Sequence, residues 1–486
     1  MIPKGISRRP GSQPLSRIAH LAIGAVAAAA TLMAPMSASF AQESDDAGPQ
    51  LNLIRDTEIE EILHEDADPI FRAAGIDPKA THIYLVGDSD MNAFVAGGQN
   101  LFLNTGLITR AKSPNQLIGV MAHETGHMAG GHLARSGQGE KQALATYLLT
   151  MGLGVLAAVG GAPDAAAGLI GSSGEFAYLT SAGFTRVQEA SADQAALTYL
   201  DKAGESGRGI VDFFDNFRYE EVFDDARRYK FFQDHPLTGD RIDALRIRAE
   251  QLPHYNVVDS PVAIAKHAIM VAKLRAFMNL PQQTFLDYPE SDTSFPAQYA
   301  RAIADYRDLQ TDRALKLTDA LIASHPDDPY LYELRGQILF EVGRAADAEP
   351  AEKKSVELKP EAPILRLNYG QVLLGENNPA KLDEAIVQIR RSLDTENDNP
   401  FAWRLLSQAY DQKNQPGMAR LAAAEENFAL GQAAEARIFG MRARMLLPKD
   451  SPEWRRATDI VLVSNPTPDD LKALAQEGST NGTIKR

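Results

Sequence analysis

The stretch GVMAHETGHMAGGH, residues 119–132, contains the pattern H-E-x-x-H. His123 and His127 are four residues apart, so on a helix their side chains lie on one face, one turn apart. Two imidazoles at this spacing can bind one zinc ion at about 2.0–2.1 Å. Glu124 follows the first histidine and is in position to act as a general base toward a water molecule at the metal. The pattern therefore predicts a helix that supplies two metal ligands, with a third from elsewhere.

His132 is the nearest candidate for the third ligand, but its spacing argues against that role. Zinc proteases with three histidines have the pattern H-E-x-x-H-x-x-G-x-x-H. Gly130 fits this pattern, whereas the position of the last histidine is occupied by Leu133. On a continued helix His132 would point about 140° away from His127. We therefore predict a histidine near a helix end, where the helix dipole favours its charged form.

A second helix, predicted from the segment FTRVQEASADQAALTYL (residues 184–200), offers a better ligand. Glu189 and Asp193 are again four residues apart and share a face. Glu189 can complete a site of two histidines and one carboxylate, with water in the fourth position. Asp193 can accept a hydrogen bond from the far nitrogen of a ligating histidine. Arg186 is, with Asp193, a candidate to support the site from outside. The alternative is a solvated acidic face with Arg186 as its ion-pair partner.

Two further segments, NAFVAGGQNLFLNTGLI (92–108) and DHPLTGDRI (234–242), accompany the two metal motifs. Together the four segments resemble the M48 family of zinc metallopeptidases. The resemblance implies a zincin-like α+β metallopeptidase domain over residues 42–255, mainly helical with a small β-sheet. It also implies zinc metalloendopeptidase activity with one zinc ion per chain. In that family pattern the zinc ligands are His123, His127 and Glu189, the catalytic base is Glu124, and Asp193 supports a ligand.

His235 lies in a His-Pro loop that the resemblance places near the metal, and it is a second catalytic candidate. Three roles are open. It could stabilise the oxyanion of a tetrahedral intermediate. It could occupy the open position on zinc and keep the enzyme inactive until substrate displaces it. It could also only brace its loop, together with Pro236 and Arg241.

The first domain is also expected to contain β-strands. Residues 81–88 are rich in β-branched and aromatic residues and predict a strand. Residues 91–108 predict two strands joined around Gly97–Gly98, whereas residues 51–74 have a helical pattern. The strand at residues 92–98 could be an edge strand that pairs with an extended peptide substrate. The alternative is a structural hairpin with no such role.

The second half of the chain repeats with a period of 34 residues. Small residues and prolines recur at this spacing, and the spaced sets are Ala302, Gly336 and Gly370; Ala314 and Ala348; Pro326 and Pro360. The pattern resembles the tetratricopeptide repeat, whose helix pairs stack into an all-α solenoid with a concave binding surface. We expect a helical linker over residues 256–294, the repeats over 295–465 and a flexible tail over 466–486.

The N-terminus predicts export. Residues 1–17 carry four basic residues and no acid, an apolar run covers residues 18–34, and Ser39 and Ala41 suit a small-residue cleavage site. Residues 1–41 therefore predict a cleavable signal peptide, with an uncleaved anchor as the alternative. The chain has no cysteine, which suits an oxidising compartment such as the periplasm.

Residues 142–174 contain one charged residue, Asp164, and several glycines. They could form buried helices, or a lid or hairpin that makes peripheral contact with a membrane. Glycines and Pro163 interrupt the run before about 20 apolar residues accumulate, which argues against a membrane span.

The charge and the motifs together limit the function. The chain carries 49 Lys and Arg against 64 Asp and Glu, a net charge of −15, which argues against nucleic acid as a partner. With the export signal and the repeats, the resemblance implies a periplasmic endopeptidase that degrades misassembled or stalled outer-membrane β-barrel proteins and assists their assembly. The repeats would recruit unfolded proteins or the assembly machinery. Two alternatives are a chaperone or adaptor with a rarely used peptidase, and an amidase acting on cell-wall peptides. The sequence names neither the client, the bond cleaved nor the oligomeric state.

Overall fold

A computed structural model describes residues 51–132, 185–217 and 235–479. The predicted signal peptide at residues 1–41 and the apolar segment at 142–174 lie outside these ranges. Asn52–Arg486 form one compact unit. Within the described ranges, every helix is too short or too polar to cross a membrane.

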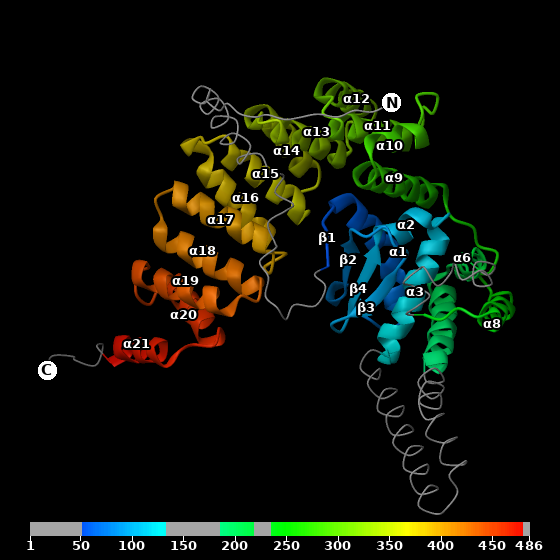
Figure 1. Ribbon diagram of the computed structural model, residues 1–486, viewed down its shortest axis with the longest axis horizontal. Helices are drawn as coiled ribbons and strands as arrows, with labels where there is room; N and C mark the ends of the chain where they lie inside the picture. Colours follow the sequence, from blue (N-terminus) through cyan, green and yellow to red (C-terminus); the bar gives the residue numbers. More distant parts are fainter. Residues whose placement is uncertain (1–50, 133–184, 218–234, 480–486) are drawn as a thin grey trace, which may run out of the picture. The chain divides into compact units, whose positions relative to one another are not determined.

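A four-stranded sheet forms the centre of the first half of the chain (Figure 1). β2 and β4 are parallel, and the two outer strands are antiparallel to their neighbours. Gly97 and Gly98 form the turn between β3 and β4 with positive φ angles of 58° and 98°, a conformation that favours glycine. The strands, in sheet order, are β1 (Leu53–Ile54), β2 (His82–Val86), β4 (Asn100–Asn104) and β3 (Ala93–Ala96).

These strands confirm the predicted strand at residues 81–88 and the predicted pair around Gly97–Gly98. The helix expected from residue 51 begins later, since α1 spans Thr57–Ala73. Residues 53–54 instead pair with β2, and the side chain of Asp56 caps α1 by accepting a hydrogen bond from the amide of Ile59.

Helices α1 and α3 pack on one face of the sheet (Figure 1). α2 (Thr105–Arg110) follows β4 directly. α3 spans Pro114–Gly130 and is capped by the predicted residue Ser113, whose hydroxyl accepts from the amide of Gln116. Gly131 ends α3 with a positive φ of 60°. The histidine motif therefore lies on a buried helix with defined ends.

Two further helices pack on α3, and a third packs on one of them. A helix over residues 185–203 crosses α3 at Gly126, where a Cβ atom would lie 2.7 Å from the carbonyl oxygen of Ala192. α6 (Arg208–Asp215) packs on α3, and α8 (Gly239–Ala249) packs on α6. The close approach at Gly126 brings the backbone of the second predicted helix next to the histidine motif.

Helix α9 (Pro261–Met278) belongs to two hydrophobic cores. Met270 and Leu274 pack in the core of the sheet and its helices. Ala272 and Ala276 pack in the first core of the C-terminal helices. The predicted linker at 256–294, which also contains α10 (Pro281–Asp287), is therefore helical and packed on both sides.

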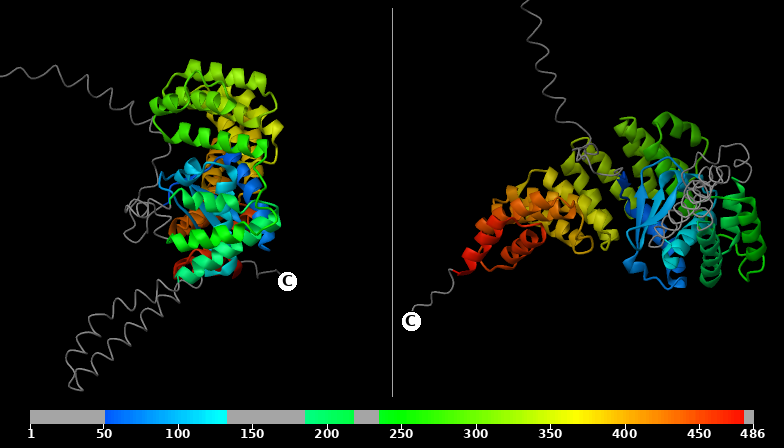
Figure 2. Two further views of the ribbon diagram at one scale, coloured as in Figure 1. Left: turned by 90° about the vertical axis from the view of Figure 1, so that its right-hand side faces the viewer. Right: turned by 60° about the horizontal axis from the view of Figure 1, so that its bottom comes forward.

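The C-terminal half consists of successive helix pairs, each packed on the next (Figures 1 and 2). The small residues that set the 34-residue period lie where the helices approach each other. A Cβ atom at Gly370 would lie 2.6 Å from Cγ1 of Ile389, and Ala314 and Ala348 are buried. The pairs are α11 (Phe295–Arg307) with α12 (Thr311–Ser324), α13 (Pro329–Glu341) with α14 (Ala345–Leu358), α15 (Pro363–Gly375) with α16 (Leu382–Leu393), α17 (Pro400–Gln412) with α18 (Pro416–Ala429), and α19 (Ala433–Leu446) with α20 (Pro452–Val463).

The predicted fold class, a mainly helical α+β domain followed by an all-α array, is confirmed. The C-terminal tail differs from the prediction, because α21 spans Pro468–Ser479 inside the range expected to be flexible. The amide and hydroxyl of Thr467 both donate to Asp470, and this interaction at the first turn favours the helix.

Candidate metal centre

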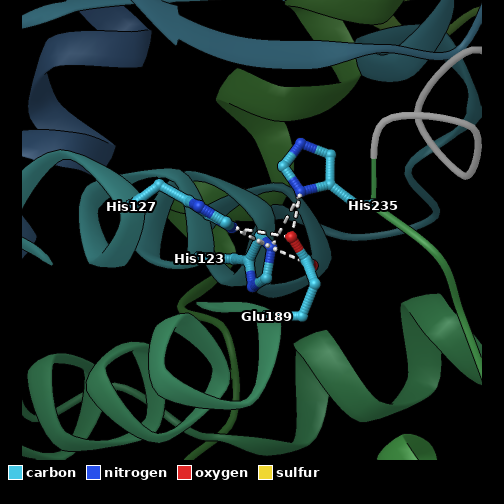
Figure 3. A group of neighbouring side chains, drawn as sticks. All are labelled: His123, His127, Glu189 and His235. Atoms are coloured by element: carbon cyan, nitrogen blue, oxygen red, sulfur yellow. Dashed lines mark hydrogen bonds and ion pairs between the residues drawn. The ribbon is translucent and has the colours of Figure 1, made fainter. Parts of the chain in front are cut away.

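Four buried side chains from three segments of the chain point toward one another (Figure 3). His123 and His127 come from successive turns of α3. Glu189 comes from the helix at 185–203, and His235 from the loop before α8. Their potential ligand atoms all lie within 4.8 Å of one another. Within the described residues, this is the group of histidines and acids that could hold a metal ion.

The first three side chains are spaced like ligands around one ion. Nε2 of His123 lies 3.1 Å from Nε2 of His127 and 3.4 Å from Oε2 of Glu189. Nε2 of His127 lies 3.2 Å from Oε1 of Glu189. Ligands at about 2.0–2.1 Å from a tetrahedral ion are about 3.3 Å apart. The two imidazoles and the carboxylate therefore fit an ion of the size of zinc.

His235 lies at the remaining corner of this arrangement. Its Nδ1 atom is 3.1 Å from Oε1 of Glu189 and 3.4 Å from Nε2 of His123. Its other nitrogen, Nε2, is 3.6 Å from Oε1 of Glu124, a carboxylate that is fully buried. His235 therefore contacts both the ligand group and the glutamate of the histidine motif.

Asp193 and Arg241 support the group from outside. Asp193 Oδ1 lies 3.0 Å from Nδ1 of His123, the ring nitrogen that faces away from the centre. Arg241 donates two hydrogen bonds of 2.8 Å to the carboxylate of Asp193 and forms a 3.0 Å ion pair with Glu189. Arg241 also donates to the carbonyl oxygen of Pro236. One guanidinium therefore connects the helix at 185–203 with the His235 loop.

His132 contacts the other histidine of the motif. Because Gly131 ends α3, the chain folds back and the Nδ1 atoms of His132 and His127 lie 3.1 Å apart. The imidazole of His132 lies over Gly130, where a Cβ atom would be 2.5 Å from its Nε2. His132 thus orients His127 as Asp193 orients His123, with the Nε2 atoms of both imidazoles facing the centre of the group.

Burial and charge set the protonation of these groups. Burial raises the pKa of Glu189, but hydrogen bonds from His123 and His127 outweigh it and lower the pKa. For His127, burial lowers the pKa to about 4. For His123, burial lowers the pKa, whereas hydrogen bonds to Asp193 and Glu189 raise it to about 10. Glu189 is therefore ionised and His127 neutral, the forms in which these side chains bind metals, whereas His123 is protonated and must lose its proton when a metal ion binds.

Comparison with known proteins agrees with this geometry. Residues 53–249 match the model of peptidase family M48. The chain contains an M48 peptidase domain. The M48 domain makes the chain a metallopeptidase, and the four grouped side chains lie within the matched residues.

Two curated relatives match more of the chain than the M48 domain, and a third matches less of it. The β-barrel assembly-enhancing protease of Yersinia pestis is 27% identical over 68% of this chain and 67% of its own length. The protein of the same name from Escherichia coli strain K12 is 26% identical over 72% of this chain and 71% of its own. The metalloprotease LoiP of the same strain is 28% identical over 33% of this chain and 59% of its own.

Two side chains of the M48 domain make contacts that the local sequence pattern does not predict. Arg186 was expected to pair with the acids of the second helix, but it is exposed, and Arg241 makes those ion pairs. Arg241 lies 48 positions after Asp193, and no local periodicity connects them. His132 lies near the end of α3 as predicted, but its contact with His127 was not predicted. The sequence GGH offered a signal for it, since a glycine pair allows the chain to turn back after a helix.

Proposed function

We propose that the chain is a periplasmic zinc-dependent endopeptidase that degrades misassembled or stalled outer-membrane β-barrel proteins and assists their assembly. The observation that carries the catalytic part is the tetrahedral spacing of His123, His127 and Glu189 beside the buried carboxylate of Glu124. The names of the two assembly-enhancing relatives support the choice of client. The N-terminal sequence supports the periplasm.

The proposed mechanism assigns a role to each side chain of the group. His123, His127 and Glu189 would hold zinc, which when bound polarises the scissile carbonyl and makes water a stronger acid. Glu124 takes the proton of the attacking water and passes it to the leaving amine. Burial of Glu124 keeps bulk water away from this proton transfer. Asp193 and His132 hold the two imidazoles in position throughout.

His235 is proposed to keep the enzyme inactive until substrate arrives. Its Nδ1 atom lies at the corner that a substrate carbonyl or water would need, close to both Glu189 and His123. Among the three roles open from the sequence, this contact favours the fourth-ligand role. The bracing role suits Arg241 better, because its guanidinium binds the carbonyl of Pro236.

Substrate is proposed to bind as an extra strand on β3. β3 lies at the edge of the sheet and packs beside α3, which carries the histidine motif. Within the described residues no strand pairs with the outer side of β3, so an extended peptide could pair there through main-chain hydrogen bonds, with little demand on its sequence. The helix pairs α11 to α20 would recruit unfolded proteins or the assembly machinery.

The first experiment measures bound zinc and cleavage of an unfolded β-barrel protein for the wild type and Glu124→Gln. The wild type should hold about one zinc per chain and cleave. Glu124→Gln should hold the same zinc and lose cleavage, because the amide cannot accept the proton. Lack of zinc in the wild type, or full activity of Glu124→Gln, would reject the proposed mechanism.

The second experiment tests His235 with the variant His235→Ala. If the imidazole blocks the fourth position, its removal should increase the rate of cleavage while zinc stays bound. Loss of cleavage at unchanged zinc content would instead assign His235 to oxyanion stabilisation.

An adaptor function is the second candidate, and the length of the repeat array favours it. Glu124→Gln separates the two candidates in cells. Each protein is expressed in a strain that lacks this chain and has an outer-membrane assembly defect. If Glu124→Gln corrects the defect as well as the wild type does, the strain needs the adaptor function and not the peptidase.

A further inference from the structure

Three aromatic rings form a row across the sheet. Tyr84 of β2 is directly opposite Phe102 of β4, and Phe102 is directly opposite Phe94 of β3. The rings of Tyr84 and Phe102 stack with centroids 4.9 Å apart. Those of Phe102 and Phe94 stack at 4.8 Å with an angle of 4° between their planes. Each strand therefore adds one ring in register.

This aromatic row lies on the face of the sheet opposite to the hydrophobic core. The alternate residues Leu85, Leu101 and Leu103 are buried in the core with α1 and α3, and Val95 packs against the same core. Phe94, Phe102 and Tyr84 are only partly buried and are not members of that core. The row is therefore a surface feature, and core packing does not explain why three aromatic residues align there.

The two ends of the aromatic row differ. Tyr84 lies on the side of the sheet toward β1, within electrostatic range of Asp398 in the turn between α16 and α17. Phe94 lies on the edge strand β3. Within the described ranges, Phe102 is the aromatic ring that stacks on Phe94. The row thus ends at the strand edge where a peptide would add.

We propose that a large aromatic or apolar side chain of the substrate extends this row, which makes Phe94 a specificity-determining residue. The inference rests on the proposed binding of substrate to the edge of β3. Directly opposite residues of paired strands share a face, with Cβ atoms about 4.5–5.5 Å apart. The substrate residue opposite Phe94 therefore places its side chain beside the ring, and its two chain neighbours point to the other face of the sheet, where α3 lies.

The preferred substrate is then an extended segment with a large aromatic or apolar side chain on the face that meets Phe94. Strands of transmembrane β-barrels have such a face, because their outward side is apolar, with aromatic residues near both membrane boundaries. Before membrane insertion, such a segment is unpaired. The aromatic row would select these strands over polar loops of the same chain by one stacking contact.

The test uses a fluorogenic peptide that the wild type cleaves. At each position in turn, one version of the peptide carries tyrosine and a second version carries leucine, and the two versions are compared. The wild type should prefer tyrosine at one position, measured as kcat/KM, by about 2- to 12-fold, the range expected for one aromatic pair. Phe94→Leu keeps an apolar edge residue, and it should reduce this ratio to about one. Tyr84→Leu, the same type of change at the far end of the row, should leave the ratio unchanged.

The outcomes separate this inference from the proposed function. A wild type that cleaves peptides without a tyrosine preference would overturn the inference alone, and so would an equal preference in Phe94→Leu. A wild type that cleaves no peptide would overturn the proposed function and the inference with it. Thermal unfolding of both variants checks that the sheet is intact.

Discussion

The imidazole of His132 lies against His127, with the two Nδ1 atoms 3.1 Å apart. Replacing His132 with alanine removes the group that orients His127, one of the proposed metal ligands. We expect zinc to bind about 10–100-fold more weakly, the usual effect of losing such a partner. Competition with a chromophoric chelator would measure this change. His64→Ala, a more exposed histidine on α1 that contacts Asp68, is the control and should leave the affinity unchanged.

The residues of the site differ in how far the sequence could predict them. His123 with His127, and Glu189 with Asp193, follow from helix geometry, because a spacing of four residues fixes a common face. The position of His132 could not be predicted in this way. The predicted angle of about 140° between His127 and His132 assumed that α3 continues, whereas Gly131 adopts a positive φ and reverses the chain. Arg241, rather than Arg186, pairs with the acids of the second helix. This is a contact between distant parts of the chain that no local pattern encodes.

At the scale of elements, the crossing of α3 with the helix at 185–203 depends on Gly126. A Cβ atom there would meet the carbonyl of Ala192 at 2.7 Å, and a backbone carbonyl cannot rotate away. Gly126→Ala should therefore lower the free energy of unfolding by about 1–3 kcal/mol, as overpacking does. It should also weaken zinc binding, because Glu189 moves with its helix. Denaturant unfolding and zinc titration would measure both, with Ala129→Ser on the exposed side of α3 as control.

Helix α14 contains a buried acid that predicts a pH dependence. Glu352 is 1% exposed and lies over Gly336, where a Cβ atom would be 2.2 Å from its Oε1. Burial raises the pKa of Glu352 well above 4.5, and the charge of Glu333 adds to this effect. A raised folded-state pKa gives stability that is present below the unfolded pKa of 4.5 and is lost as pH rises toward the folded pKa.

We therefore expect Glu352→Gln to become progressively more stable than the wild type as pH rises above about 4.5. The expected slope is about 1.4 kcal/mol per pH unit until the folded pKa is reached. Denaturant midpoints at pH 5 and pH 8 would measure it. A difference that does not change with pH would contradict the assignment. Glu357→Gln on the same helix, at an exposed position, is the matched control.

At the scale of the whole molecule, a buried ionic cluster joins the M48 domain to the repeats. Nζ of Lys273 on α9 lies 2.8 Å from Asp56 and 3.0 Å from Glu58, at the start of α1. The hydroxyl of Tyr299 on α11 donates to the same carboxylate of Glu58. Lys273, Glu58 and Tyr299 are each at most 5% exposed, so water cannot replace a missing partner.

Lys273→Met should therefore destabilise the chain by about 3–5 kcal/mol, because it leaves buried carboxylates without their cation. Adding Glu58→Gln to Lys273→Met should restore part of that loss. The midpoint of denaturant unfolding, followed for both variants, measures the coupling. Additive losses in the double variant would show that Lys273 and Glu58 do not interact.

The two-part organisation could be predicted from sequence, since the 34-residue period and the histidine motif occupy separate halves. The role of α9 could not be predicted from the sequence. Its apolar residues point to two sides, so it has no single apolar face and resembles a connecting segment. Only the packed structure assigns Met270 and Leu274 to one core and Ala272 and Ala276 to another.

Sharing α9 between two cores has a consequence for how such a protein could be recombined. A chimaera that takes its repeats from another protein and is joined just before Pro261 would bring a foreign α9 to the M48 domain. Its counterparts of Met270 and Leu274 would then have to fit a core that did not evolve with them. A junction after Met278 would move the same mismatch to the surface of α11. In this architecture α9 is the segment that any exchange of the repeats must redesign.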